Sequence, residues 1–166
     1  MTGAFRVELL DAIHDRTQFS SGSESLDRYL RTQATQDARR RVSTCYVLLD
    51  TASGTLAGFY TLAAGGIPLN DLPPDLARKL PRYPSIPVAR IGRLAIALPY
   101  RGRKLGSALL ADAAKRVLRS DMGVYALAVD AKDEAATAFY RHHGFVSLQS
   151  APDQLFLPLA SFIGSS

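Results

Sequence analysis

Hydrophobic positions recur along this chain with two different spacings. Short runs of β-branched and aromatic residues, or of alternating apolar and polar residues, are typical of β-strands. They predict strands at residues 5–10, 43–50, 55–63, 88–98, 124–129, 145–148 and 154–159. A short turn-like stretch joins the second and third of these runs, so we expect an antiparallel hairpin there. The last two runs close the chain as another hairpin.

Three segments instead place apolar residues every three to four positions, which is the spacing of one face of an α-helix. They predict helices at about 25–40, 105–119 and 132–142. The predicted buried stripe of the second helix consists of Leu105, Leu109, Ala113 and Val117. Asp130 is placed to cap the third helix, and Asp133 and Glu134 suit the positive end of its dipole.

Residues 68–87 contain six prolines around a short helical stretch at 75–80. Because proline lacks the N–H that a sheet ladder needs, we expect this segment to cross the surface rather than join the core. In the second half of the chain strands precede helices, which favours a right-handed crossover and parallel pairing. The sequence therefore predicts an α/β fold (α+β by stricter criteria) with a mixed central sheet flanked by helices.

The length and composition place the chain among ordinary globular proteins. A chain of 166 residues has room for one core, so residues 1–166 are predicted to form a single domain. An apolar content of 47% without a long apolar run excludes a disordered chain and a membrane span. The first residues lack the apolar stretch of a signal peptide, so we expect a cytoplasmic protein. The single cysteine, Cys45, allows neither an internal disulfide nor a zinc site.

The net charge of +5 is distributed unevenly. Residues 78–104 contain eight of the 20 basic residues and none of the 15 acidic ones. These eight are Arg78, Lys79, Arg82, Arg90, Arg93, Arg101, Arg103 and Lys104. A surface of this kind attracts phosphate-rich partners, either a nucleic acid or a nucleotide cofactor.

The segment RGRKLGS at 101–107 stands between an apolar strand and an amphipathic helix. Its glycines let the backbone approach a ligand, and the first amides of a helix have no partner within the helix. Such a helix start binds phosphate through these amides and the helix dipole. From the spacing alone, an ordinary basic turn between strand and helix is the alternative. The two familiar nucleotide motifs, G-x-x-x-x-G-K-[ST] and G-x-G-x-x-G, are absent.

The stretch GRLAIALPYRGRKLGSALLADAAKRVL at 92–118 resembles the acetyl-CoA-binding core of the GNAT acetyltransferase superfamily. Its signature, Arg/Gln-x-x-Gly-x-Gly/Ala, is present except that Lys104 replaces the middle glycine. This departure is compatible with the signature if Lys104 adopts ordinary helical or turn angles and contributes only its N–H. The resemblance implies that the backbone of Leu94, Ala95 and Ile96 pairs with the pantetheine arm. It implies that the pyrophosphate is held by Arg101, Gly102, Arg103, Lys104, Leu105, Gly106 and Ser107.

The resemblance covers nearly the whole chain and narrows to the GNAT toxins of bacterial type II toxin–antitoxin systems. It rests on residues 18–44, 60–65, 80–84, 92–95, 129–131, 139–145 (FYRHHGF) and 155–159 (LFLPL). It implies acetyl transfer from acetyl-CoA to the α-amino group of an aminoacyl-tRNA, which blocks translation. It also implies a small ribbon-helix-helix antitoxin, and because relatives often dimerise, a homodimer is one expectation.

Tyr140 lies where this family places its catalytic tyrosine, so the resemblance implies a general acid for the departing CoA thiolate. The alternative is a packed aromatic beside Phe139. A free α-amino group has a pKa of about 8, which a neighbouring ester lowers, so the reaction does not require a general base. Asp130, Asp133 and Glu134 either relay protons or cap the helix. The adjacent His142 and His143 point in different directions on a helix and are not expected to bind a metal.

Basic residues outside the phosphate loop are candidates for tRNA contacts, with solvated charge as the alternative. They are Arg39, Arg40, Arg78, Lys79, Arg82, Arg90 and Arg93. Two further functions stay open at this point. One is a GNAT enzyme that acetylates a protein N-terminus or a small amine. The other is a non-catalytic module that binds RNA or CoA and acts with an antitoxin as a co-repressor.

Overall fold

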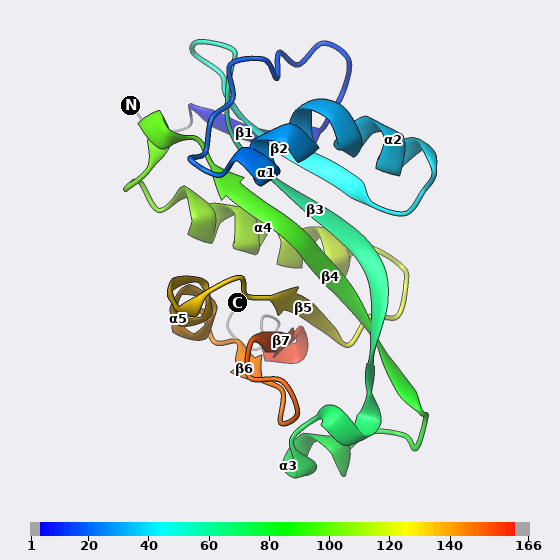
Figure 1. Ribbon diagram of the computed structural model, residues 1–166. Coiled ribbons are helices and arrows are strands. Elements are labelled where there is room, and N and C mark those ends of the chain that lie inside the picture. Colours follow the sequence, from blue (N-terminus) through cyan, green and yellow to red (C-terminus); the bar gives the residue numbers. More distant parts are fainter. Residues whose placement is uncertain (1–3, 162–166) are drawn as a thin grey trace. The chain divides into compact units, whose positions relative to one another are not determined.

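The computed structural model describes residues 4–161. Its strands are β1 (Phe5–Leu9), β2 (Thr44–Asp50), β3 (Thr55–Pro68), β4 (Ser85–Ile96), β5 (Ala126–Asp130), β6 (Val146–Ser147) and β7 (Gln154–Pro158). Its α-helices are α1 (Glu24–Arg28), α2 (Ala34–Arg39), α3 (Pro74–Ala77), α4 (Leu105–Arg119) and α5 (Glu134–His142) (Figure 1). Among the described residues, no helix has the length and apolar character needed to cross a membrane.

The strands form one seven-stranded sheet in the order β1-β2-β3-β4-β5-β7-β6. β4 and β5 are parallel, whereas β1 pairs with β2, β2 with β3, β5 with β7, and β6 with β7 in antiparallel fashion. The predicted mixed α/β fold and both predicted hairpins are confirmed. The chain divides into two compact units, one of residues up to Ala63 with Gly92–Ala113, the other of Ala64–Ile91 with residues from Ala114 onward.

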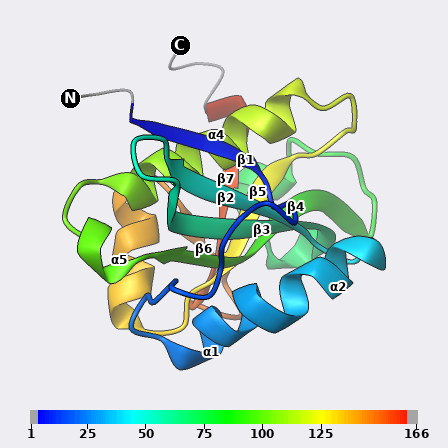
Figure 2. The ribbon, with the colours of Figure 1, turned by 90° about the horizontal axis from the view of Figure 1, so that it is seen from above.

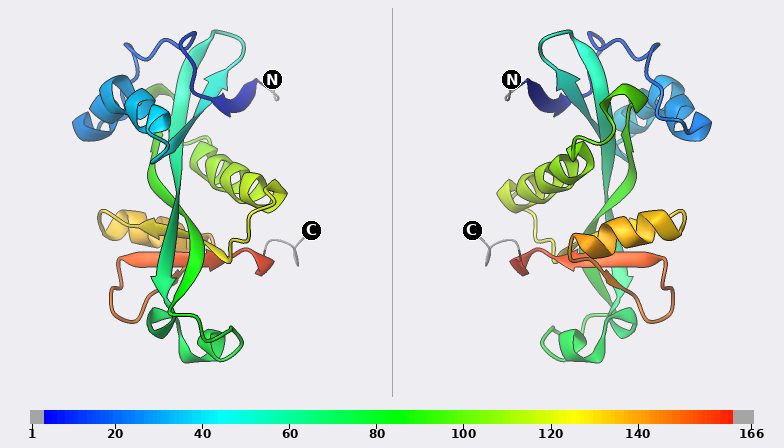
Figure 3. Two further views of the ribbon diagram at one scale, coloured as in Figure 1. Left: turned by 90° about the vertical axis from the view of Figure 1, so that its right-hand side faces the viewer. Right: turned by 90° about the vertical axis from the view of Figure 1, so that its left-hand side faces the viewer.

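In the first unit, helical layers cover both faces of β2 and β3 (Figures 2 and 3). α1 and α2 lie on one face, and α4 lies on the other. Phe59 and Val47 are fully buried beneath Leu30 and Ala34 of the first face. The stripe predicted for α4, which consists of Leu105, Leu109, Ala113 and Val117, is also buried.

The helix predicted at 25–40 is interrupted by a π-helical segment at Tyr29–Gln33, which separates α1 from α2. A π-helical turn shifts the i→i+4 hydrogen bonding, so it disturbs backbone partners in the middle of a helix. Arg16 compensates here, because its guanidinium donates to the Leu30 carbonyl at 2.9 Å and to Thr35 Oγ1 at 3.0 Å. The apolar period continues through the segment, so periodicity does not reveal it.

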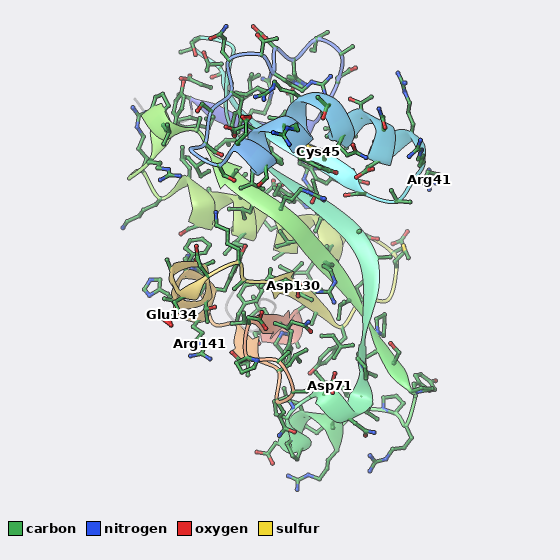
Figure 4. All side chains as sticks on the ribbon, viewed as in Figure 1. Arg41, Cys45, Asp71, Asp130, Glu134 and Arg141 are labelled. Carbon is green, nitrogen blue, oxygen red and sulfur yellow. The ribbon has the colours of Figure 1, made fainter. Side chains whose placement is uncertain are left out.

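The end of α2 is closed by a Schellman motif, in which Arg41 takes the left-handed position. The amide of Val42 donates to the Asp37 carbonyl at 3.0 Å, and the amide of Arg41 donates to the Ala38 carbonyl at 3.1 Å. Arg41 has φ +59°, in the region that favours glycine, and it is exposed at the helix end (Figure 4).

The second unit has its own core around the ends of β3 and β4, where α3 lies (Figure 1). Ile67, Leu69, Leu72 and Ile86 are buried in it, so the proline-rich segment does contribute to the core. The prediction that it merely crosses the surface was wrong. Pro87 even lies within β4, because its carbonyl, which proline retains, accepts the Tyr125 amide at 2.9 Å.

Helix α5 begins two residues later than predicted and has a different cap. The Asp133 carboxylate accepts the amide of Ala136 at 2.8 Å, so Asp133 is the N-cap and the assignment of Asp130 was wrong. Asp130 instead accepts from Arg90 at 3.2 Å. Glu134 lies in the first turn and Arg141 in the last, as the helix dipole favours (Figure 4).

Candidate functional site

Residues 101–104 form an exposed, cationic loop immediately before α4. Gly102 (φ +81°) and Lys104 (φ +60°) both have left-handed backbone conformations. The first turn of α4 contains no acidic residue, and its hydrogen bonding begins with the Ala108 amide on the Lys104 carbonyl at 3.3 Å. The amides at the start of α4 therefore precede any intrahelical bond, beside three basic side chains, which suits an anion.

Lys104 does not have the ordinary helical or turn angles under which its replacement of glycine would leave the signature unaffected. It keeps the left-handed conformation for which the family signature uses glycine. A side chain with a Cβ is strained in this conformation by roughly 1–2 kcal/mol. The loop therefore keeps the backbone shape of a glycine loop and adds a cation.

Replacing Lys104 with glycine is expected to raise the free energy of unfolding by about 0.5–1 kcal/mol, because the relief of strain exceeds the greater chain entropy of glycine. Lys104→Ala removes the same charge but keeps the strain, and it serves as the control. Urea denaturation followed by circular dichroism measures both variants. A Lys104→Gly protein less stable than Lys104→Ala would contradict the left-handed assignment.

The loop is attached to the segment that precedes α1. The Arg101 guanidinium donates to the Ser21 carbonyl at 2.5 Å, and the Leu98 amide donates to the Ser20 carbonyl at 2.9 Å. The buried carboxylate of Asp27 accepts both the amide and the hydroxyl of Ser21, at 3.0 and 2.7 Å. The hydrogen bond from Arg101 to the Ser21 carbonyl thus positions the loop. Nothing in the spacing of Ser21 and Asp27 indicated this role.

Tyr100 supports the loop from the other end. Its hydroxyl donates to Asp50 at 2.6 Å, and this hydrogen bond lowers the pKa of the Asp50 carboxyl. The guanidinium of Arg103 lies 5.2 Å from the centre of the Tyr100 ring, a cation–π distance. Two of the loop's basic side chains, Arg101 and Arg103, therefore have defined neighbours although the loop is exposed.

The segment Leu94–Ile96 lies at the end of β4, beyond its register with β5. In the residues that the structure describes, that register runs from Val88 to Ile91. Ala95 is buried, whereas Leu94 and Ile96 are half-buried. A strand segment past the end of its ladder is suited to pairing with an extended ligand, in the manner of an added strand.

Tyr140 on α5 is 9% exposed and packs edge-on against Phe139 and Phe145, with ring centroids 5.2 and 5.4 Å away. Burial raises the pKa of its phenol to about 12. The hydroxyl is therefore protonated throughout the physiological range and able to donate a proton or a hydrogen bond. These contacts are those of a packed aromatic, and they are equally those required to hold a general acid.

The basic stretch at 78–104 is free of acids in the sequence but not in space. Arg78 pairs with Asp75 at 2.8 Å, and Arg90 pairs with Asp130 at 3.2 Å. Both pairs are partly or largely exposed and therefore contribute little stability. Lys79, Arg82, Arg39 and Arg40 are exposed. The stretch is divided between the two units at Ile91, so a shared RNA surface remains a prediction.

The guanidinium of Arg93 is held against an aromatic ring. It lies 3.6 Å over the centre of the Tyr29 ring, which in turn stacks on Phe59 at 6.4 Å and 14°. The Tyr29 hydroxyl donates to Asp37 at 2.8 Å, and burial raises the pKa of this phenol to about 12. Tyr29 was not predicted from the sequence, because an aromatic residue on the apolar face of a helix is typical of a hydrophobic core.

Cys45 is buried on β2, and burial raises the pKa of its thiol to about 12. The reactive form of a cysteine is the thiolate, so this thiol is unsuited to act as a nucleophile near neutral pH. Within residues 4–161, no group of three or more His, Cys, Asp or Glu side chains is arranged to hold a metal ion.

The mixed sheet, the strand segment past its ladder and the basic loop that opens α4 together are the features of an acetyltransferase fold. The sequence model of the acetyltransferase (GNAT) family matches residues 8–145. The chain belongs to the GNAT acetyltransferase family, as the motifs predicted.

Two curated relatives are similar to the chain over almost their whole length. The tRNA-acetylating toxin of Mycobacterium tuberculosis is 36% identical over 159 residues, which cover 95% of this chain and 93% of the relative. The probable toxin TacT of Sinorhizobium fredii is 30% identical, covering 96% and 95%. The resemblance to GNAT toxins that the sequence motifs indicated is confirmed by these relatives.

Solved structures of related toxins have the same fold. AtaT complexed with acetyl-methionyl-tRNAfMet superposes with a TM-score of 0.90 at 30% identity, covering 97% of this chain and 98% of that one. AtaTR bound with acetyl-CoA gives 0.83 at 30% identity, covering 98% of both chains.

Proposed function

We propose that this protein is a toxin that transfers an acetyl group from acetyl-CoA to the α-amino group of the amino acid on a charged tRNA, and thereby blocks translation. The observation that carries the proposal is the similarity, over 95% of the chain, to a tRNA-acetylating toxin. An acetylated amino group has no nucleophilic lone pair for peptide-bond formation. The proposed site of action is therefore the cytoplasm, where charged tRNA is used.

The residues of this chain fit acetyl-CoA. Two left-handed residues, Gly102 and Lys104, shape a cationic loop directly before the first turn of α4, and a helix start beside cations suits a pyrophosphate. We propose that Arg101 to Ser107 bind it, largely through backbone N–H groups, and that Leu94, Ala95 and Ile96 pair with the pantetheine arm. Acetyl-CoA supplies the acetyl group as a thioester.

In the reaction, a C–N bond forms between the neutral acceptor amine and the acetyl carbon, and the C–S bond breaks. The proton that the amine loses passes to solvent, from which Tyr140 regains the proton that it gives to the CoA sulfur. The CoA sulfur leaves with the electron pair of the broken bond. We propose that Tyr140 donates its phenolic hydrogen to that sulfur. The exposed or half-buried cations Arg39, Arg40, Arg78, Lys79, Arg82, Arg90 and Arg93 would contact tRNA phosphates, which makes binding strongly salt-dependent.

Two further parts of the proposal concern assembly. We propose that residues 1–166 form a single GNAT domain, since β3 and β4 each contribute residues to both compact units. We also propose a ribbon-helix-helix antitoxin and a homodimer. Solved relatives include AtaT bound to the C-terminus of its antitoxin AtaR, and a KacTA–DNA complex. Exposed apolar side chains at Leu9, Ile13 and Val42 are available for a protein contact.

The proposal is tested by incubating the protein with acetyl-CoA labelled in the acetyl group and with total tRNA, either charged or deacylated. Label is expected only on charged tRNA, and it should be released with the amino acid by mild alkali. Equal labelling of deacylated tRNA, or labelling of added protein or small amines alone, would reject the substrate assignment.

A further inference from the structure

Asp27 on α1 is a buried carboxylate for which the proposed reaction has no use. Its side chain is 6% exposed, and a carboxylate in such a position costs free energy unless hydrogen bonds replace its hydration. Its Oδ1 atom accepts the Ser21 amide at 3.0 Å and the Ser21 hydroxyl at 2.7 Å. Ser21 is also buried, and its hydroxyl oxygen accepts the Ser23 amide at 3.2 Å. Asp27 therefore fixes both the backbone and the side chain of Ser21.

The backbone fixed in this way holds the residues that lead into the cationic loop before α4. The N–H that Ser21 donates to Asp27 belongs to the same peptide group as the Ser20 carbonyl. That carbonyl accepts the Leu98 amide at 2.9 Å, and the next one, of Ser21, accepts the Arg101 guanidinium at 2.5 Å. Hydrogen bonds in series strengthen one another in a site of low dielectric constant. Asp27 is thus connected to Arg101 through a single residue.

Gly22 brings the two segments into contact. Its φ of +91° lies in the left-handed region that favours glycine. A Cβ at Gly22 would lie 3.4 Å from Leu98 Cδ2 and 3.6 Å from Arg101 Nη2. The backbone of this turn therefore lies against the Arg101 guanidinium, with no side chain between them.

The cationic loop has little packing of its own that could keep its shape. Residues 101–104 are all exposed, and a Cβ at Gly102 would meet no atom of the described residues within 4 Å beyond its chain neighbours. A loop that becomes ordered only when its ligand binds loses affinity to that ordering, whereas a loop already held in its bound shape does not. The hydrogen bond from Arg101 to Ser21 holds this loop from outside.

We propose that Asp27 is a positioning residue for acetyl-CoA, which through Ser21 and Arg101 sets the shape of the cationic loop before the ligand binds. This assignment rests on the proposed function, because it takes the loop as the pyrophosphate site. Asp27 acts on affinity and not on the reacting atoms. One N–H of Arg101 is committed to Ser21, and a guanidinium has four more for a phosphate.

Isothermal titration calorimetry with acetyl-CoA tests the assignment without tRNA. Asp27→Ala removes both hydrogen bonds to Ser21, and we expect the Kd for acetyl-CoA to rise about tenfold. Asp27→Asn keeps an oxygen that accepts the same two hydrogen bonds and should restore most of the affinity. Glu24→Ala removes a carboxylate from the same helix that bonds to Arg31 instead, and it should bind acetyl-CoA as the wild type does.

Arg101→Ala and the double variant with Asp27→Ala separate positioning from a general loss of stability. Because Asp27 acts through Arg101, the double variant should bind acetyl-CoA no more weakly than Arg101→Ala alone, whereas independent effects would multiply. Near-ultraviolet circular dichroism shows whether each variant is folded. Ser21→Ala removes only the hydroxyl bond, should raise the Kd about threefold, and replaces Asp27→Ala if that variant does not fold.

Two results would overturn the assignment alone. One is a folded Asp27→Ala protein, or in its place Ser21→Ala, that binds acetyl-CoA as tightly as the wild type. The other is a double variant in which the effects of Asp27→Ala and Arg101→Ala multiply. A wild type that binds no acetyl-CoA would overturn the proposed function and the assignment together.

Discussion

Replacing Tyr140 with phenylalanine is expected to slow acetyl transfer to charged tRNA by about 100- to 1,000-fold. The variant keeps the ring contacts with Phe139 and Phe145 and loses only the hydroxyl, so the fold should be unaffected. We place the effect in the lower part of the range for general-acid catalysis. A phenol whose pKa is about 12 is a weaker acid than a thiol, so transfer of its proton to the departing sulfur is less favourable than from an ordinary tyrosine.

The raised pKa of Tyr140 also determines how the reaction rate depends on pH. A general acid acts only while it is protonated. A raised pKa therefore moves the loss of its activity to higher pH. We therefore expect kcat/KM to rise with pH as the acceptor amine, with a pKa of about 8 or lower, becomes neutral. No fall from Tyr140 should appear up to about pH 10, the ordinary pKa of tyrosine.

Tyr125→Phe is the matched control for Tyr140→Phe, because Tyr125 is also partly buried and burial raises the pKa of its phenol too. Initial rates at saturating acetyl-CoA compare the two variants with the wild type. If Tyr140→Phe retained more than a third of the wild-type rate, or matched Tyr125→Phe, Tyr140 would be a packed aromatic and no more.

Replacing Gly58 with alanine is the second large expected effect. A Cβ at Gly58 would lie 2.8 Å from the Ala95 carbonyl oxygen and 2.9 Å from Ile96 Cδ1. The first of these is backbone and cannot rotate away. We expect the free energy of unfolding to fall by about 1–3 kcal/mol, as in other overpacked sites.

Gly58→Ala should also weaken the binding of acetyl-CoA, because the displaced Ala95 carbonyl belongs to the segment proposed to pair with pantetheine. Gly65→Ala on the same strand is the control. Its Cβ would meet Val88 and Arg90 at ordinary distances of 3.5 and 3.6 Å. Urea denaturation and KM for acetyl-CoA separate the two effects. Equal behaviour of the two alanine variants would contradict the close approach of β3 and β4 at Gly58.

Periodicity predicted the elements best where an apolar stripe repeats over several turns. Helix α4 was predicted at 105–119, the residues at which it is found, because its stripe is unbroken and no proline lies within it. Local signals failed where distant partners decide the outcome. Pro87 lies within β4 because the Tyr125 amide bonds to its carbonyl, which proline retains. Asp130 does not cap α5 because it accepts a hydrogen bond from Arg90, forty residues away in the sequence.

Some parts of the candidate site could be predicted from the sequence and others could not, and the difference has a physical reason. The phosphate loop is contiguous, so its glycines and cations are visible as a motif. Tyr29 lies in an apolar run, and only the packing shows that its ring carries the guanidinium of Arg93. The left-handed angle of Lys104 follows from the loop as a whole and not from the preference of lysine.

Arg41 and Lys104 are the two residues other than glycine with positive φ in the described part of the chain, and both are cations. Protein engineering that selects only for thermal stability would replace each of them with glycine, because relief of backbone strain would raise the stability at both positions. It would also remove two positive charges, one of them from the loop proposed to bind the pyrophosphate. Thermostabilised versions of this protein should therefore be screened with acetyl-CoA and tRNA present, and not by melting temperature alone.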